Sequence, residues 1–130
     1  VRYFKKETIT QFTSKQSRDS RRGIGWDKPE FNRRYVNLAS DYASTMCFGH
    51  TGFTGTMVWA DPKYDLIYVF LSNRVYPSQE NKKLLRQNVR TNIMDVGVNQ
   101  IIEIDFHHIL IHILINIILI NIKIYIKTKI

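Results

Sequence analysis

The chain has only one cysteine, Cys47, among its 130 residues. A single thiol excludes an intramolecular disulfide and any zinc site built from cysteines, and it leaves the redox environment of the protein open. We expect Cys47 to serve as a small apolar residue beneath a strand rather than as a reactive thiol, because free cysteines are usually buried.

Acidic residues are also scarce: 11 Asp and Glu face 19 Lys and Arg, which gives a formal net charge of +8. Charged residues make up only 23% of the chain and hydrophobic residues 44%. This balance excludes a wholly disordered chain, and the length allows one domain of ordinary size.

The sequence begins with Val1, and no charged and then apolar leader with a small-residue cleavage site follows it. A secretory leader would have that pattern. We therefore expect the chain to be a piece of a longer protein.

Composition divides the chain into three regions. Residues 1–21 form a polar, basic segment. Residues 22–98 have apolar runs separated by turn residues, as is typical of a mixed α+β domain, and isoleucine supplies 14 of the 32 residues in 99–130. The basic residues in the first region and in the residues just after it raise the hypothesis that the chain binds nucleic acid. Because neither an RNP-like motif nor a recognition-helix pattern accompanies them, we expect a solvated surface and no nucleic-acid partner.

Three short strands are expected in the middle region. Residues 22–26 are one candidate, and residues 55–60 and 66–71 would form an antiparallel hairpin around a turn at 61–65. The unbroken apolar run 66–71 is typical of a strand that is covered on both faces. The aromatic residues of this region are expected to serve in packing, namely Trp26, Trp59, Tyr64 and Tyr68.

A helix is expected after Pro77, with Ser78 as its cap. Its apolar stripe would follow a four-residue spacing, and Gly97 would end it. The stripe consists of Leu84, Leu85, Val89, Ile93 and Val96. With a single helical turn near residues 7–12, these elements predict an α+β fold: an antiparallel sheet of about three strands with a packed C-terminal helix.

The most informative stretch is residues 48–56, which hold three glycines, the imidazole of His50 and the hydroxyl of Thr51. Glycines at this density indicate that the backbone closely approaches a ligand or another segment. The stretch therefore predicts a strand edge that offers N–H donors, hydroxyls and a proton carrier to a small polar group.

The triplet His50-Thr51-Gly52 resembles the Lys-Thr-Gly or His-Thr-Gly triplet of serine β-lactamases and penicillin-binding-protein-like hydrolases, particularly their esterase and class C-like branch. The likeness extends to residues 23–27, to Trp59-Ala60-Asp61-Pro62, to the strand that ends in Ser72-Asn73-Arg74, and to the closing helix. It covers about residues 7–98.

This resemblance implies hydrolysis of a small-molecule ester or amide through an acyl-serine, without a metal or another cofactor, in a periplasmic or other extracytoplasmic location. His50 would take part in the electrostatics and proton transfer beside the nucleophile, and Thr51 would hydrogen-bond a polar group of the substrate. Gly52 would let the strand come close, and the backbone N–H of Phe53 would be an oxyanion donor.

The family's nucleophile lies in Ser-x-x-Lys, and no serine of this chain has a lysine three residues later. We therefore expect the chain to be inactive alone and to require the missing N-terminal part of the hydrolase as its partner. Tyr35-Val36-Asn37 has the letters of the family's Tyr-x-Asn motif, but it lies only thirteen residues before His50. We interpret that match as accidental.

We expect the domain to end near Val98 and residues 99–130 to be an Ile-rich low-complexity tail. The alternative is that the chain is a non-catalytic binding or membrane-anchoring module. The apolar run 109–122 of the tail is interrupted by polar residues and is shorter than a membrane span requires. Residues 118–126 alternate in the period of a strand, which would be an aggregation hazard if it stayed unpaired. The histidines His107, His108 and His112 lack further well-placed ligands, so no metal site is expected.

Overall fold

The computed structural model describes residues 3–32 and 34–127, and for residues 112–127 it describes the backbone alone. The elements are the helix α1 (Lys6–Thr13), the strands β1 (Phe48–Thr51), β2 (Met57–Asp61) and β3 (Leu66–Phe70), and the helices α2 (Lys83–Arg86) and α3 (Val89–Lys127). The chain divides into two compact units, Val1–Val98 and Asn99–Ile130.

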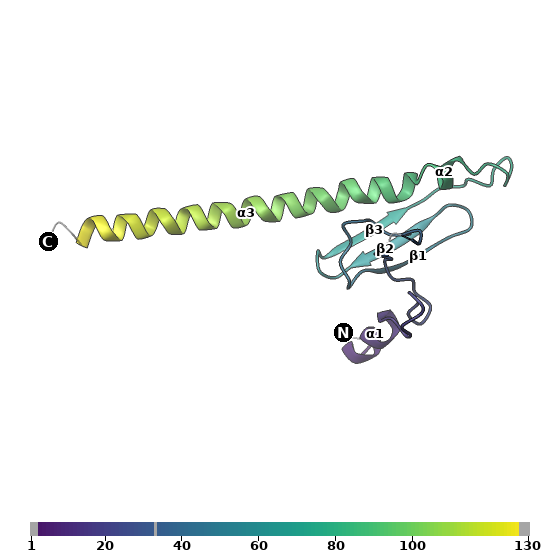
Figure 1. Cartoon of the computed structure of the whole chain (residues 1–130), viewed down its shortest axis with the longest axis horizontal. Coiled ribbons are helices and arrows are strands. Elements are labelled where there is room, and N and C mark those ends of the chain that lie inside the picture. The colour runs from purple at the N-terminus through teal and green to yellow at the C-terminus, as the bar shows by residue number, and fades with distance from the viewer. Residues whose placement is uncertain (1–2, 33, 128–130) are drawn as a thin grey trace. The chain divides into compact units, whose positions relative to one another are not determined.

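The first unit contains an antiparallel sheet in the order β1-β2-β3 (Figure 1). The β2-β3 hairpin has the expected place, and Asp65 adopts the left-handed conformation, with a φ of 48°, where the chain reverses. The three strands and the C-terminal helix confirm the predicted α+β class. Helix α1 also agrees with the helical turn expected over residues 7–12.

The strand predicted at residues 22–26 is wrong. This segment makes only single bridges, from Arg22 to Asp27 and from Asp27 to Gly49. Gly25 has a φ of 77°, and the Gly23 N–H donates to the Trp26 carbonyl at 2.8 Å, so the backbone turns back on itself instead of extending. The first strand of the sheet is β1, which ends with His50 and Thr51 of the triplet, directly before Gly52.

One face of the sheet is buried and the other is exposed. Met57 and Trp59 belong to the core, together with Met94 and Val98 of α3. The Tyr68 hydroxyl also donates to the Arg90 carbonyl of α3 at 3.1 Å. These residues bind the start of α3 to the sheet.

On the opposite face, Ile67 is 73% exposed and Val69 is 56% exposed. The prediction that β3 is covered on both faces is therefore wrong for the described residues, since none of them buries these side chains. An unbroken apolar run indicates the environment a strand needs, but it does not show that the chain itself supplies that environment.

The single helix expected after Ser78 is divided. Asn88 has a φ of 50° and separates α2 from α3, because asparagine tolerates the left-handed conformation better than most residues. The predicted apolar stripe is also wrong: Leu85, Ile93 and Val96 are exposed. The buried side of α3 is instead formed by Arg90, Met94 and Val98, at the same four-residue spacing.

Gly97 lies inside α3 and does not end it, and the backbone of residues 118–126 is helical rather than extended. A helix satisfies its N–H and C=O groups within its own segment, whereas a lone strand leaves them without partners. This physical difference outweighs the alternating pattern of the tail. The side chains of 118–126 lie outside the described residues.

Within the described part of the chain, no helix combines the length and the apolar character needed to cross a membrane. The same residues contain no cluster of three or more His, Cys, Asp or Glu side chains able to hold a metal ion. His107 contacts the Glu103 carbonyl at 2.7 Å, and the side chain of His112 lies outside the described residues.

Candidate functional site

Strand β1 directs His50 and Thr51 to opposite faces of the sheet, because successive side chains of a strand alternate. His50 is exposed and pairs with Val58 of β2, which in turn pairs with Val69 of β3. His50 therefore stands at the end of a row on the exposed apolar face. Thr51 pairs with Met57 and lies on the face that contains the core.

The imidazole of His50 has two polar contacts. Its Nδ1 lies 2.9 Å from the Thr51 carbonyl, and its Nε2 lies 3.5 Å from Nη1 of Arg22. A carbonyl can only accept a hydrogen bond and a guanidinium can only donate. These partners fit a ring proton on Nδ1 and an Nε2 lone pair that faces Arg22.

Arg22 is held in place by a buried carboxylate. Asp27 is only 2% exposed, and its side chain lies 3.0 Å from Nε of Arg22 and 3.7 Å from Nη2 of Arg21. The backbone of Asp27 also exchanges two hydrogen bonds with Gly49, at 2.7 and 3.0 Å. The positive charge beside His50 is thus anchored directly to β1.

Close approach explains all three glycines, and a Cβ on Gly55 would lie 2.5 Å from Oγ of Ser72. A Cβ on Gly49 would collide with the Val58 carbonyl and the Trp59 ring, and a Cβ on Gly52 would collide with Oγ1 of Thr56. The Gly52 N–H also donates to the Thr56 carbonyl at 2.8 Å, which closes the turn between β1 and β2. The expectation that these glycines permit close approach is correct, although the neighbours here are segments of the chain itself.

Phe53 lies in this turn, with its side chain 70% exposed and the guanidinium carbon of Arg74 at 4.8 Å from its ring centroid. Among the described residues, none accepts a hydrogen bond from the Phe53 N–H. The donor is therefore available to an incoming group.

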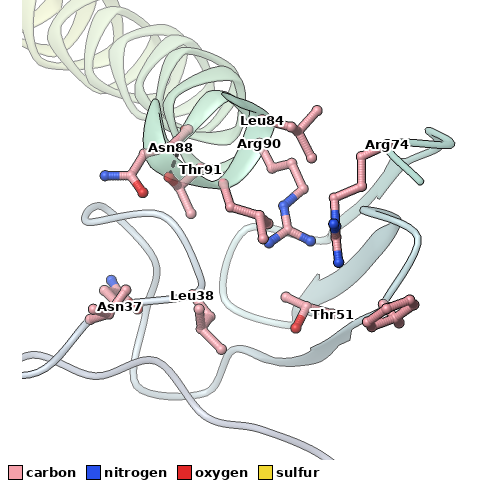
Figure 2. Close-up of a pocket in the computed structure, with 12 residues that line it drawn as sticks. Asn37, Leu38, Thr51, Arg74, Leu84, Asn88, Arg90 and Thr91 are labelled. Carbon is pink, nitrogen blue, oxygen red and sulfur yellow. Dashed lines mark hydrogen bonds between the residues drawn. The ribbon is translucent and has the colours of Figure 1, made fainter. Parts of the chain in front are cut away.

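A cavity of about 430 Å³ lies beside the end of β1 (Figure 2). Thr51, Gly52 and Phe53 line it, and His50 does not. The remaining lining comes from the loop before β1, from the loop after β3 and from the two helices: Val36, Asn37, Leu38, Arg74, Leu84, Leu85, Asn88, Arg90 and Thr91.

Asn37 reaches this cavity from the Tyr35-Val36-Asn37 segment, but its amide is used locally. Its Oδ1 accepts from the Ala39 N–H at 3.1 Å, and its Nδ2 donates to the Ser40 carbonyl at 3.2 Å. These bonds shape a loop, which is a structural use of the residue.

Two arginines of the cavity were not foreseen as site residues. Arg90 is buried and donates from Nη1 to the carbonyls of Gly55 at 3.3 Å and Thr56 at 3.1 Å. Burial, and then the positive charge of Arg74, lower the pKa of Arg90. The signal that could have found Arg90 is its alignment with Met94 and Val98, which places a charge on the buried side of the helix.

Comparisons with known proteins identify the family of the chain. Residues 3–92 match the family model Beta-lactamase. Over 84 residues the chain is 33% identical to proteins of Salmonella typhi, Salmonella paratyphi B and Salmonella newport, each named "Putative D-alanyl-D-alanine carboxypeptidase".

That alignment covers 65% of this chain and 19% of each relative, so the chain spans about a fifth of their length. No solved structure gives a significant match. The family match covers well over half of the chain, including β1 and its triplet, the β2-β3 hairpin and the start of α3. The chain belongs to the Beta-lactamase family.

Proposed function

We propose that this chain forms one wall of the active site of a serine hydrolase, which cleaves an ester or amide through an acyl-serine intermediate. The supporting observation is the His50-Thr51-Gly52 triplet at the end of β1, within a segment that matches the Beta-lactamase family. The chain would be inactive alone and would complete the site together with a segment that supplies the serine.

The chemistry assigns a role to each residue of the wall. The serine oxygen would attack the carbonyl carbon of the substrate, and its proton would pass to a neighbouring base. The exposed Nε2 of His50 and the Arg22 charge would set the electrostatics of that transfer. The Phe53 N–H would donate to the oxyanion that forms, and Thr51 would bind a polar group of the substrate.

The serine must come from another segment, since none of the seven serines is followed by lysine at the third position. The exposed apolar face of the sheet adjoins His50 and offers a surface for that segment, through Val58, Ile67 and Val69. Apolar surface gathered on one side of a domain is typical of a surface that another element covers.

The name of the relatives favours one substrate class, a peptide that ends in D-alanyl-D-alanine. A nitrophenyl ester and a chromogenic β-lactam carry the same kind of reactive carbonyl. They allow hydrolysis or acylation to be followed optically.

The test combines the full chain with an upstream segment of the parent gene that contains Ser-x-x-Lys. We expect hydrolysis of the ester or the peptide by the mixture and none by either part. His50→Ala should lower the rate of the mixture by about 10²–10⁴-fold if the imidazole acts in proton transfer.

His107→Ala is the matched control, because His107 is an exposed histidine of α3 whose ring contacts the nearby Glu103 carbonyl and the edge of the neighbouring Phe106 ring. Equal loss of activity in both variants would contradict the assignment of His50. Labelling of this chain alone by a reactive-serine probe would contradict the two-part site, and a complex that forms without any hydrolysis would favour a binding module.

A further inference from the structure

We propose that the cavity between α1 and the start of β1 binds a single-chain amphiphilic anion, an alkyl chain that ends in a carboxylate. This cavity has a volume of about 560 Å³, which lies in the range of small-molecule sites. It shares no lining residue with the cavity beside Thr51. The proposal therefore goes beyond the hydrolase site and does not depend on it.

The charges on the wall of this cavity have one sign. Three lysines line it: Lys6, Lys15 and Lys28. None of the twelve lining residues is Asp or Glu. Outside the lining, the Asp61 carboxylate favours the charged form of Lys28, but it already accepts hydrogen bonds from Ser44 and from the Lys63 N–H. The cavity therefore offers positive charge to an anion from solution.

Two of the lysines are positioned by backbone carbonyls. Nζ of Lys28 donates to the Met46 carbonyl at 3.1 Å, and Nζ of Lys15 donates to the Arg18 carbonyl at 2.9 Å. An ammonium group has three N–H donors, so each lysine keeps donors for an incoming carboxylate. Lys28 is half-buried, and burial lowers its pKa because the charged form loses solvation. A carboxylate in the cavity would offset that loss.

The rest of the wall is largely apolar and comes from distant segments. Its apolar side chains are Phe4, Ile9, Met46, Phe48 and Pro62. Lys6, Thr10 and Thr13 recur at spacings of four and three, so one side of α1 lies along the cavity. Ile9 and Met46 are exposed, and α1 buries none of its residues. An alkyl chain would remove this apolar surface from water, while its carboxylate would meet the lysines.

The experiment titrates decanoate, below the concentration at which it forms micelles, into the full chain with ¹³C-labelled isoleucine, valine and methionine methyl groups. We expect saturable shifts of the Ile9 and Met46 methyl signals by NMR. Ile67 and Val69 are the internal control, because they are exposed apolar residues outside the cavity. Equal shifts with the same midpoint on the sheet face would overturn the proposal.

Two further ligands separate the contribution of the head group from that of the alkyl chain. Hexanoate should bind more weakly than decanoate, by about fourfold for each missing methylene that the cavity would bury. Decyltrimethylammonium has the same alkyl chain as decanoate substituents allow but a positive head group, and it should give no saturable shift. Equal saturation by this cation would show apolar adsorption alone and would overturn the proposal.

Lys28→Gln should weaken decanoate binding by about tenfold, because glutamine removes the charge and keeps an N–H donor. Lys63→Gln is the matched control, since Lys63 is an exposed lysine outside the cavity. Equal weakening in both variants would contradict the site. If the Lys28 variant does not fold, the comparison of decanoate with decyltrimethylammonium on the unmodified chain decides the matter.

A last arm adds the upstream segment that contains Ser-x-x-Lys to the chain before the titration. We expect decanoate to bind the mixture as it binds the chain alone. Loss of the Ile9 and Met46 shifts in the mixture would show that the added segment covers this cavity, and it would overturn the proposal.

Discussion

The Cys47 thiol is completely buried, as the sequence predicts for a lone cysteine. Burial, and then the negative charge of Asp61, raise its pKa from 9.0 to about 12. A thiol with so high a pKa is almost entirely protonated at neutral pH, so it is a poor nucleophile. The raised pKa of this single residue therefore makes the stability of the protein depend on pH in the alkaline range.

The folded state keeps the Cys47 proton to a higher pH than the unfolded state, whose pKa is 9.0. The stabilising contribution is therefore complete below pH 9 and is lost as the pH rises towards about 12. The Lys28 pKa is lowered, chiefly by burial, and this acts in the opposite direction. We expect Cys47→Ala to flatten the alkaline loss of stability, measured as the urea midpoint from about pH 8 to 11.

Thr45→Ala, at an exposed position nearby, serves as the control and should leave the pH profile unchanged. An identical slope in the Cys47 variant and the wild type would contradict this account of the thiol.

Glycine substitutions give a second test at this scale. Gly49→Ala should cost about 1–3 kcal/mol, because the added Cβ collides with the Val58 carbonyl and the Trp59 ring. Gly97→Ala has nothing within 4 Å of the added Cβ and should stabilise the helix by about 0.5–1 kcal/mol. Chemical unfolding of the two variants measures the difference, and a loss at Gly97 equal to that at Gly49 would contradict the packing described.

At the scale of elements, a buried polar pair joins the segment before β1 to the end of β2. Asp61 is 1% exposed, and it accepts hydrogen bonds from the Ser44 N–H at 2.7 Å and the Ser44 hydroxyl at 2.5 Å. Ser44→Ala removes the hydroxyl donor and leaves a buried carboxylate oxygen with less support. We expect a loss of about 1–3 kcal/mol in the free energy of unfolding.

Ser17→Ala is the control for this element, because Ser17 is exposed and its hydroxyl accepts a hydrogen bond from the Asp19 N–H alone among the described residues. The comparison uses unfolding midpoints at neutral pH. A loss of stability that is no greater for Ser44→Ala than for Ser17→Ala would show that the pair does not support the sheet.

For the whole molecule, we expect the exposed apolar face of the sheet to promote self-association. Val69→Lys places a charge at the β3 end of the row formed with Val58 and His50. We expect less aggregation of the isolated chain in light-scattering measurements, since charges on exposed sheet surfaces oppose edge and face association. The same variant should weaken complementation by the segment that carries the serine.

Val36→Lys provides the matched control, since Val36 is 69% exposed but lies in a loop outside the sheet. Equal reduction of light scattering by both lysines would assign the effect to net charge alone and would remove the role given to the sheet face.

The sequence by itself determined the family, the α+β class, the β2-β3 hairpin and the burial of Cys47. These features depend on local information: turn residues at 61–65, β-branched and aromatic runs, and the His50-Thr51-Gly52 triplet. The segments that flank the triplet also resemble those of the family, in the same order along the chain. Such signals lie within a few residues of the structure they specify.

Only the tertiary structure decided which faces are buried and which side chains meet. Periodicity placed the core side of the helix on Leu85 and Ile93, whereas the sheet covers Arg90 and Met94. The bend at residues 22–26 and the placement of Arg74 and Arg90 in one cavity depend on contacts between distant segments. A periodic pattern records which residues are apolar, and only packing against a neighbour selects the side that is covered.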